Sequence, residues 1–211
     1  MLFIPTDGTV ILMQKFVCAV SLVVLIVCGG CRNPWMENVL INLYHIGDKG
    51  PGGGIIFYRS AKGFTDTYSG KTHHFLEVAP DEMPGLEWAT FATPAGYYEV
   101  SGTGTAIGTG RKNTDVIIKC VNDNAGTPSS DCRAADACRQ YTSGGKTDWF
   151  LPSIDELQAL YKSGLLTGSN YYWSSSDYGD DNSVWVCSFI NGDSFDLLKD
   201  DNCYVRAVRS F

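Results

Sequence analysis

Short apolar runs alternate with glycine-rich turns in the first half of the chain. The turn residues 47–54 lead into a β-branched and aromatic run at residues 55–58, which predicts a strand. A second strand is predicted at residues 75–79. Beyond Tyr171 the chain again shows short runs and turn residues, so we expect only short strands and turns there.

Helical signals occur in three places between these strand regions. Thr114 can accept a hydrogen bond from a first helical turn, which predicts a helix beginning near that residue. A second helix is predicted over residues 131–142. The third has Ser153 as its N-cap, and the carboxylates of Asp155 and Glu156 follow in its first turn. Its apolar face carries Leu157, Leu160 and Tyr161.

The composition favours one irregular domain over a helical bundle. Charged residues make up 18% of the 211 residues, and the chain contains 23 glycines, 11 tyrosines, 10 phenylalanines and 5 tryptophans. A chain of this length can bury a single apolar core. We therefore expect an α+β fold with short strands, two or three helices and many loops.

The N-terminus carries an apolar run at residues 16–27, preceded by Lys15 and followed by a Gly-Gly pair and Cys31. The run has the length of a signal peptide and is too short for an ordinary membrane-spanning helix. Its end resembles a lipobox, in which the cysteine receives a diacylglyceryl group before cleavage. We expect a lipoprotein signal peptide at residues 1–30 and a lipid anchor at Cys31, which would hold the protein at the outer surface of the cell envelope.

Two alternatives remain open for this region. The apolar run could stay in the membrane as an uncleaved helix. Translation could also begin at Met13 instead of Met1, because Lys15 would then supply the basic residue that a leader needs. After a tether at residues 31–43, we expect a single binding domain at residues 44–211.

Charge and motifs exclude several classes of function. The net charge of −7 disfavours nucleic acid as a partner, because phosphates require a basic face. The sequence contains no P-loop and no nucleophile elbow, and the domain at residues 44–211 contains no Cys-x-x-Cys pair. The adjacent His73 and His74 would point to opposite faces of a strand and could not easily share a metal ion. We expect no catalytic residues, no cofactor and no metal site, and therefore no enzyme.

Five cysteines remain in the domain if Cys31 is lipidated. An exported compartment favours disulfides, but five cysteines cannot all pair within one chain. The preferred bridge joins Cys120 to Cys138 and would clamp two predicted helices together. A bridge between Cys120 and Cys132 is the alternative, and a buried thiol is expected for any cysteine left over.

Four motifs carry a resemblance to a known family. They are GTAIGTG at residues 104–110, DWFLPSIDEL at 148–157, YWSSS at 172–176 and VRAVR at 205–209. In this order they resemble the C-terminal domain of the Legionella collagen-like adhesin family. The resemblance covers most of residues 44–211, and it implies a C-type lectin-like fold of the formylglycine-generating-enzyme branch. The triplets with which lectins of this fold coordinate calcium are absent, so no calcium-dependent sugar binding is implied.

The motif residues also have a physical role as scaffold. Trp149 and Trp173 supply large apolar bodies for a small core. Arg206 and Arg209 have several hydrogen-bond donors each and can tie irregular loops together.

The segment at residues 177–204 has an unusual composition. It contains seven aspartates and no glutamate, whereas the rest of the chain contains ten aspartates and six glutamates. Gln and Met are also absent, and Trp185 and Lys199 are the segment's single Trp and Lys. Almost every residue in the segment can be encoded by a codon that ends in C. Turns also favour Asp and Asn over Glu, so turn chemistry is the alternative explanation.

The composition resembles that of the variable region in proteins diversified by a retroelement, which copies a template with randomised adenines into the end of a gene. That resemblance implies a ligand-binding surface, with Trp185, Phe189, Gly192 and Lys199 as scaffold. Small polar and aromatic residues suit such a surface for the reasons that they suit antibody loops. The expected ligand-binding residues are Asp177, Tyr178, Asp180, Asp181, Asn182, Val186, Ser188, Ile190, Asp193, Phe195, Asp196, Leu198, Asp200 and Asn202.

Two functions follow from these observations. The first is a surface-displayed lipoprotein whose variable segment binds an unknown protein on another cell or a host surface. The second is an adhesin of fixed specificity that binds a glycan.

Overall fold

The apolar runs in the first half of the chain form strands that pair with its last residues. In the structure, a computed structural model, β1 (Ile55–Thr65) contains the predicted strand, and β2 (Thr72–Val78) contains all of the second prediction except Ala79. Together with β8 (Val208–Ser210) they form an antiparallel sheet in the order β1-β2-β8.

The structure describes residues 41–90, 100–123, 132–180 and 182–211. The predicted signal peptide at 1–30, the lipidation site Cys31 and the predicted ligand-binding residue Asp181 lie outside these residues, as does the tether up to residue 40. The described residues all belong to one compact unit, Ile41–Phe211.

A second sheet has the strand order β3-β7-β4-β5-β6. Its neighbouring strands are antiparallel except β4 and β7, which run parallel. The described residues beyond Tyr171 lie in strands and turns, as predicted. The strands of this sheet are β3 (Met83–Glu87), β4 (Tyr171–Asp177), β5 (Ser183–Ser188), β6 (Ser194–Leu198) and β7 (Asn202–Val205).

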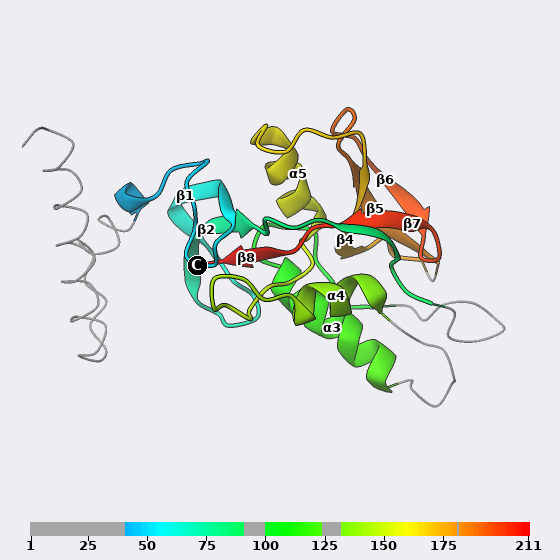
Figure 1. Cartoon of the computed structure of the whole chain (residues 1–211). Coiled ribbons are helices and arrows are strands. Elements are labelled where there is room, and N and C mark those ends of the chain that lie inside the picture. The colour runs from blue at the N-terminus through cyan, green and yellow to red at the C-terminus, as the bar shows by residue number, and fades with distance from the viewer. Residues whose placement is uncertain (1–40, 91–99, 124–131, 181) are drawn as a thin grey trace, which may run out of the picture. The chain divides into compact units, whose positions relative to one another are not determined.

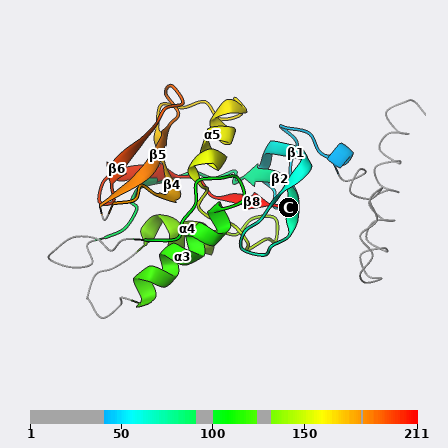
Figure 2. The same ribbon diagram turned by 180° about the vertical axis from the view of Figure 1, so that it is seen from behind.

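Three helices cover the second sheet. Figures 1 and 2 show α5 (Ile154–Lys162) on one side of it, and α3 (Gly110–Asp123) and α4 (Arg133–Gln140) on the other. Each side has its own apolar cluster, one beneath α5 and one beneath α3 and α4. The predicted α+β fold class, with short strands, few helices and many loops, is confirmed.

The helix ends agree only in part with the sequence signals. Ser153 caps α5 as predicted, and Glu156 completes a capping box by binding back to the Ser153 backbone. The prediction that Thr114 caps α3 is wrong. Helix α3 begins at Gly110, and the buried Thr114 hydroxyl donates to the Gly110 carbonyl at 2.8 Å and accepts from the Leu151 amide at 3.0 Å. Helix α4 is two residues shorter at each end than the predicted 131–142.

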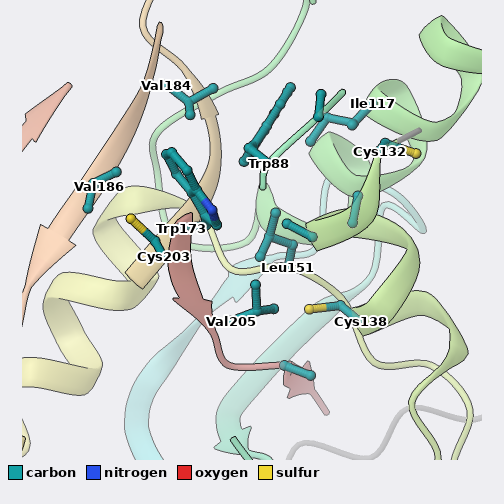
Figure 3. Close-up of a cluster of buried hydrophobic side chains, with 14 of the residues drawn as sticks. Trp88, Ile117, Cys132, Cys138, Leu151, Trp173, Val184, Val186, Cys203 and Val205 are labelled. Atoms are coloured by element: carbon teal, nitrogen blue, oxygen red, sulfur yellow. The ribbon is translucent and has the colours of Figure 1, made fainter. Parts of the chain in front are cut away.

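The larger apolar cluster lies between α3, α4 and the second sheet. Trp88 and Trp173 are buried in it, together with Leu151 and Val205 (Figure 3). Trp149 is buried in the same cluster. Buried aromatic rings of this size contribute much of the apolar area that a small domain removes from water. The predicted core roles of Trp149 and Trp173 are therefore confirmed.

Arg209 of β8 ties β2 to the loop that precedes α5. Its guanidinium donates to Glu77 at 2.9 Å and to Asp148 at 2.5 Å. Glu77 is buried in β2, and its carboxylate also accepts from the amides of Gly52 and Gly54 in the predicted glycine turn. A buried carboxylate is tolerated when it is paired and hydrogen-bonded in this way. The predicted role of Arg209 as a tie between loops is confirmed.

The predicted bridge between Cys120 and Cys138 is not formed, and Cys138 carries a free thiol. Cys138 is buried in the larger cluster, where Figure 3 shows its sulfur turned toward Val205. Burial raises the pKa of this thiol, which disfavours the thiolate that disulfide chemistry requires. The alternative bridge to Cys132 is not formed either. The Cys132 thiol donates to Asp136 at 3.2 Å.

Glu156 links the start of α5 to the glycine-rich loop before α3. Its side chain is 0% exposed and accepts from the Gly108 and Ser153 amides, each at 2.8 Å. Desolvation raises the pKa of the carboxyl to about 7, although these backbone hydrogen bonds oppose the shift. The folded state therefore holds a carboxyl that resists ionisation below neutral pH.

This carboxyl predicts a loss of stability as the pH rises. Its pKa is higher in the folded than in the unfolded chain, so its contribution is fully present at low pH and is lost between pH 4.5 and 7. The free energy of unfolding, relative to Glu156→Gln, should fall by about 3 kcal/mol across this range. Urea denaturation of both proteins at several pH values measures the difference. A difference that stays flat with pH would contradict the prediction.

Candidate functional site

The predicted ligand-binding segment forms a hairpin at the edge of the second sheet. Strands β5 and β6 pair in an antiparallel register that runs from Ser183 opposite Leu198 to Cys187 opposite Ser194. Strand β6 is the last in the sheet order, and Figure 1 shows it at the outer side of the domain. The other described residues of the segment lie at the end of β4, in the turns before, between and after β5 and β6, and at the start of β7.

One face of the hairpin belongs to the core and cannot meet a ligand. Val184 and Val186 of β5 lie in the cluster beneath α3 and α4, and Phe195 and Leu197 of β6 pack against it. The predictions for Val186 and Ser188 are therefore wrong, because their side chains are 0% and 3% exposed. Strand β5 is covered on both sides of the sheet, so alternation along it gives no solvent face.

Asp177 is also misassigned as a ligand-binding residue. Its side chain is almost fully buried at the end of β4 and pairs with the buried Lys199 ammonium at 3.1 Å. The ammonium also lies over the Trp88 ring, 5.4 Å from its centre. The Asp177 carboxylate further accepts from the Gly179 amide at 2.8 Å. These contacts make Asp177 and Lys199 part of the scaffold that holds the hairpin.

The opposite face of the hairpin is exposed to solvent toward the end of β6, away from the turn between the two strands. We call the residues on it the hairpin face: Tyr178, Trp185, Ser194, Asp196 and Leu198. Trp185 lies opposite Asp196 in the strand register, and its ring packs edge-on against Tyr178 with centroids 4.7 Å apart. Leu198 is 52% exposed and Tyr178 is 43% exposed. An exposed aromatic and an exposed aliphatic side chain on a strand-supported surface are features of binding surfaces.

The other exposed candidates lie at the two ends of the hairpin, in turns except for Asn202, which begins β7. Ile190 and Asp193 occupy the turn between β5 and β6. A second group lies at the opposite end, where the Lys199 amide donates to the Asn182 carbonyl at 2.9 Å and so joins two turns. The predicted residues thus do not form one patch, and Phe195 is half-buried on the core side. This second group contains Asp180, Asn182, Asp200 and Asn202.

Turn chemistry explains some of the aspartates but not all of them. Asp180 accepts from the amides of Asn182 and Ser183, at 2.9 and 2.6 Å, as short side chains do in turns. Asp177 has the same kind of bond. Asp196, in contrast, lies in the middle of β6, where Asp is an unfavourable residue. The presence of Asp at this position is therefore not explained by turn formation.

A cavity of about 420 Å³ lies between α5 and the hairpin face. Gln158 spans its inner side and donates to the Ser194 hydroxyl at 2.7 Å and to the Gly192 carbonyl at 2.8 Å. Burial raises the pKa of Asp155 at the rim, although Lys162 opposes the shift. The cavity is lined by Thr105, Ile154, Asp155, Gln158, Lys162, Trp185 and Ser194.

The helix residues that line this cavity were not among the ligand-binding residues predicted from the sequence. Asp155, Gln158 and Lys162 recur at the spacing of one helix face, which was a readable signal for a polar stripe on α5. The sequence does not show which element this stripe faces, because the neighbouring residues Trp185 and Ser194 are distant in sequence. Among the residues that the structure describes, no three His, Cys, Asp or Glu side chains are grouped as metal ligands would be.

Fold and site together define a mixed α+β domain that presents an exposed hairpin beside a helix-lined cavity. The family model described as the Lcl C-terminal domain matches residues 77–209, which is more than half of the chain. The chain therefore belongs to the Lcl C-terminal domain family, as its motifs suggested. No curated protein matches the chain. Membership supports an adhesin-like domain at the cell surface. No helix in the described part of the chain is long and apolar enough to cross a membrane.

The ion pair beneath the hairpin predicts an asymmetric response to mutation. Asp177→Asn leaves the buried Lys199 charge without this carboxylate, which should lower the free energy of unfolding by about 3 kcal/mol. The double variant Asp177→Asn, Lys199→Met should recover part of that loss, because it buries no charge. Urea denaturation followed by tryptophan fluorescence measures both effects.

The matched control for this measurement is Asp193→Asn, an exposed position on the same hairpin. It should change the free energy of unfolding by less than about 0.5 kcal/mol. An Asp177→Asn variant as stable as this control would show that the pair does not stabilise the fold.

Proposed function

We propose that this protein is a surface-displayed lipoprotein that binds a partner macromolecule through the hairpin face and its neighbouring turns. Its anchor would be the lipid on Cys31, and the partner would be a protein on another cell or a host surface. The family membership supports the surface location. The domain itself supplies the binding surface.

The distribution of charge carries this proposal. Residues 177–204 contain seven aspartates and one lysine, which account for −6 of the net charge of −7. The Asp177 and Lys199 charges are buried together, whereas five other aspartates of the segment are exposed: Asp180, Asp193, Asp196, Asp200 and Asp201. A protein that concentrates its charge beside exposed aromatic and aliphatic side chains attracts and orients a partner of opposite charge.

We further propose that a retroelement diversifies the exposed positions of the segment. Lys199 and Trp185 are the two residues of the segment whose codons cannot end in C. They support this idea, because codons that are not diversified are expected at scaffold positions and both residues have a scaffold role. Lys199 is the buried partner of Asp177, and Trp185 is half-buried beneath Tyr178 and beside the cavity. Buried positions such as Val186 cannot vary freely without loss of core packing. Variation is therefore confined to the exposed positions.

The neighbouring DNA tests the diversification. We expect a reverse transcriptase gene and a near-copy of the segment with adenines in the codons for the exposed positions, and none in those for Val186 and Ser188. Adenines that occur equally often in the codons for buried residues would contradict the proposal that variation is confined to exposed positions. Absence of both elements would reject diversification altogether. The exposed set is Tyr178, Asp180, Asn182, Ile190, Asp193, Asp196, Leu198, Asp200 and Asn202.

A glycan-binding adhesin is the second candidate, and the cavity is the observation in its favour. Trp185 offers an aromatic wall, while Asp155, Gln158 and Lys162 offer donors and acceptors beside it. A concave site of this kind, with a few converging polar groups, is typical of small-ligand recognition. Under this alternative the cavity, and not the exposed turns, would carry the specificity.

The binding surface is tested by adhesion of beads that carry the full chain to cells. Replacing Tyr178 and Leu198 together by alanine should lower the number of bound cells at least about tenfold, as expected when two exposed anchors are lost. The matched control replaces Tyr68 and Ile46, which are each 52% exposed and lie outside the segment. Adhesion should not change in the control. Equal loss in both variants would reject the hairpin face as the binding surface.

A further inference from the structure

The outer edge of β6 has backbone groups that no described strand pairs with. Strand β6 ends the sheet order, and its inner edge is bonded to β5. Two hydrogen bonds show which backbone groups of β6 face β5. The Lys199 amide donates to the Asn182 carbonyl, and the Ser188 amide donates to the Asp193 carbonyl, both at 2.9 Å. Bonded and non-bonded pairs alternate along an antiparallel ladder. The amides and carbonyls of Ser194 and Asp196 therefore point outward.

The Leu198 amide points outward in the same pattern, while its carbonyl accepts from the Asp201 amide at 3.0 Å in the following turn. The edge thus offers three donors and two acceptors in a row. An edge of this kind is a template for another strand, and natural proteins block it unless it is used. Main-chain bonds to such an edge supply affinity in strand-addition complexes.

A second copy of this chain is a poor occupant of the edge. Two β6 strands paired over their full length in antiparallel fashion would place Asp196 opposite Asp196, because this residue is the centre of Ser194–Leu198. Like charges directly opposite each other destabilise a strand pair. The same carboxylate favours an incoming strand that carries a cation at its centre.

The side chains of β6 define what would flank that cation. Ser194, Asp196 and Leu198 point to the hairpin face, and Phe195 and Leu197 point to the core side, where they are half-buried. Residues next to the cation on an added strand would lie beside Phe195 and Leu197, so apolar side chains fit there. A residue two positions from the cation would lie opposite Ser194, which lines the cavity.

We propose that the β6 edge binds an extended segment of a partner protein as an added antiparallel strand, with a Lys or Arg opposite Asp196 and apolar residues on either side of it. This inference rests on the proposed function and names its mode of recognition. The net charge of −6 on residues 177–204 supplies the long-range attraction for such a basic segment. The register then supplies the specificity.

A synthetic peptide tests the register directly. The probe is the end-blocked peptide Thr-Val-Thr-Val-Lys-Val-Thr-Val-Thr, added to the full isotope-labelled chain in detergent micelles. Backbone amides of Ser194, Asp196 and Leu198 should shift on binding and exchange their hydrogens more slowly. A peptide with Glu in place of the central Lys should bind at least about tenfold more weakly. N-methylation of the central Lys and the two nearest Thr residues should abolish binding, because it removes the main-chain donors.

The variant Asp196→Lys separates strand addition from general attraction. It keeps the backbone edge and should reverse the preference, so that the peptide with central Glu binds more tightly than the one with Lys. The matched control is Asp201→Lys, which makes the same change of charge in the exposed turn after β6. It should weaken binding of the Lys peptide modestly, strengthen binding of the Glu peptide modestly, and leave the preference for Lys intact.

Three results would overturn the proposal. N-methylated peptides could bind as well as unmodified ones, the preference could stay the same in Asp196→Lys, or the three amides could become protected by concentration alone, which would indicate pairing of two copies. If any of these occurs while adhesion still depends on Tyr178 and Leu198, the proposed function stands and only strand addition fails. If adhesion is insensitive to those residues, the proposed function fails independently of the peptide result.

Discussion

The buried ion pair between Asp177 and Lys199 is the constraint on which the exposed hairpin depends. Asp177 ends β4 and Lys199 follows β6, so this pair joins the two ends of the hairpin segment across the core. Neither charge could remain buried alone without a large desolvation cost. The pair also ties the hairpin to the rest of the domain through the contact of Lys199 with Trp88. Residues between these two positions can therefore differ on their exposed side while the ends stay fixed.

Much of the fold was predictable because its signals are local. The N-cap at Ser153, the two strand runs and the glycine turn each depend on neighbours within a few residues, and each was found where the sequence indicated. The start of α3 was not predictable in this way. The Thr114 hydroxyl bonds to Leu151, 37 residues away, and such a partner leaves no trace in a local pattern.

The composition of residues 177–204 distinguishes the segment from the rest of the chain but does not assign its residues one by one. Seven aspartates make the segment acidic, yet composition does not separate the buried side chains of Asp177, Val186 and Ser188 from their exposed neighbours. Those differences arise because α5 covers one side of β5 and the larger core covers the other. The cysteine pairing failed for a related reason, since spacing alone does not reveal that Cys138 points into the core.

The position of β8 makes the fold depend on residues that follow the hairpin in the chain. Strand β8 pairs with β2, and Arg209 on it bonds to Glu77 and Asp148. Without these residues the first sheet would lose a strand, and the buried Glu77 carboxylate would lose its guanidinium partner. Insertions or deletions in the coding sequence of the hairpin are therefore compatible with this fold only when they keep the reading frame.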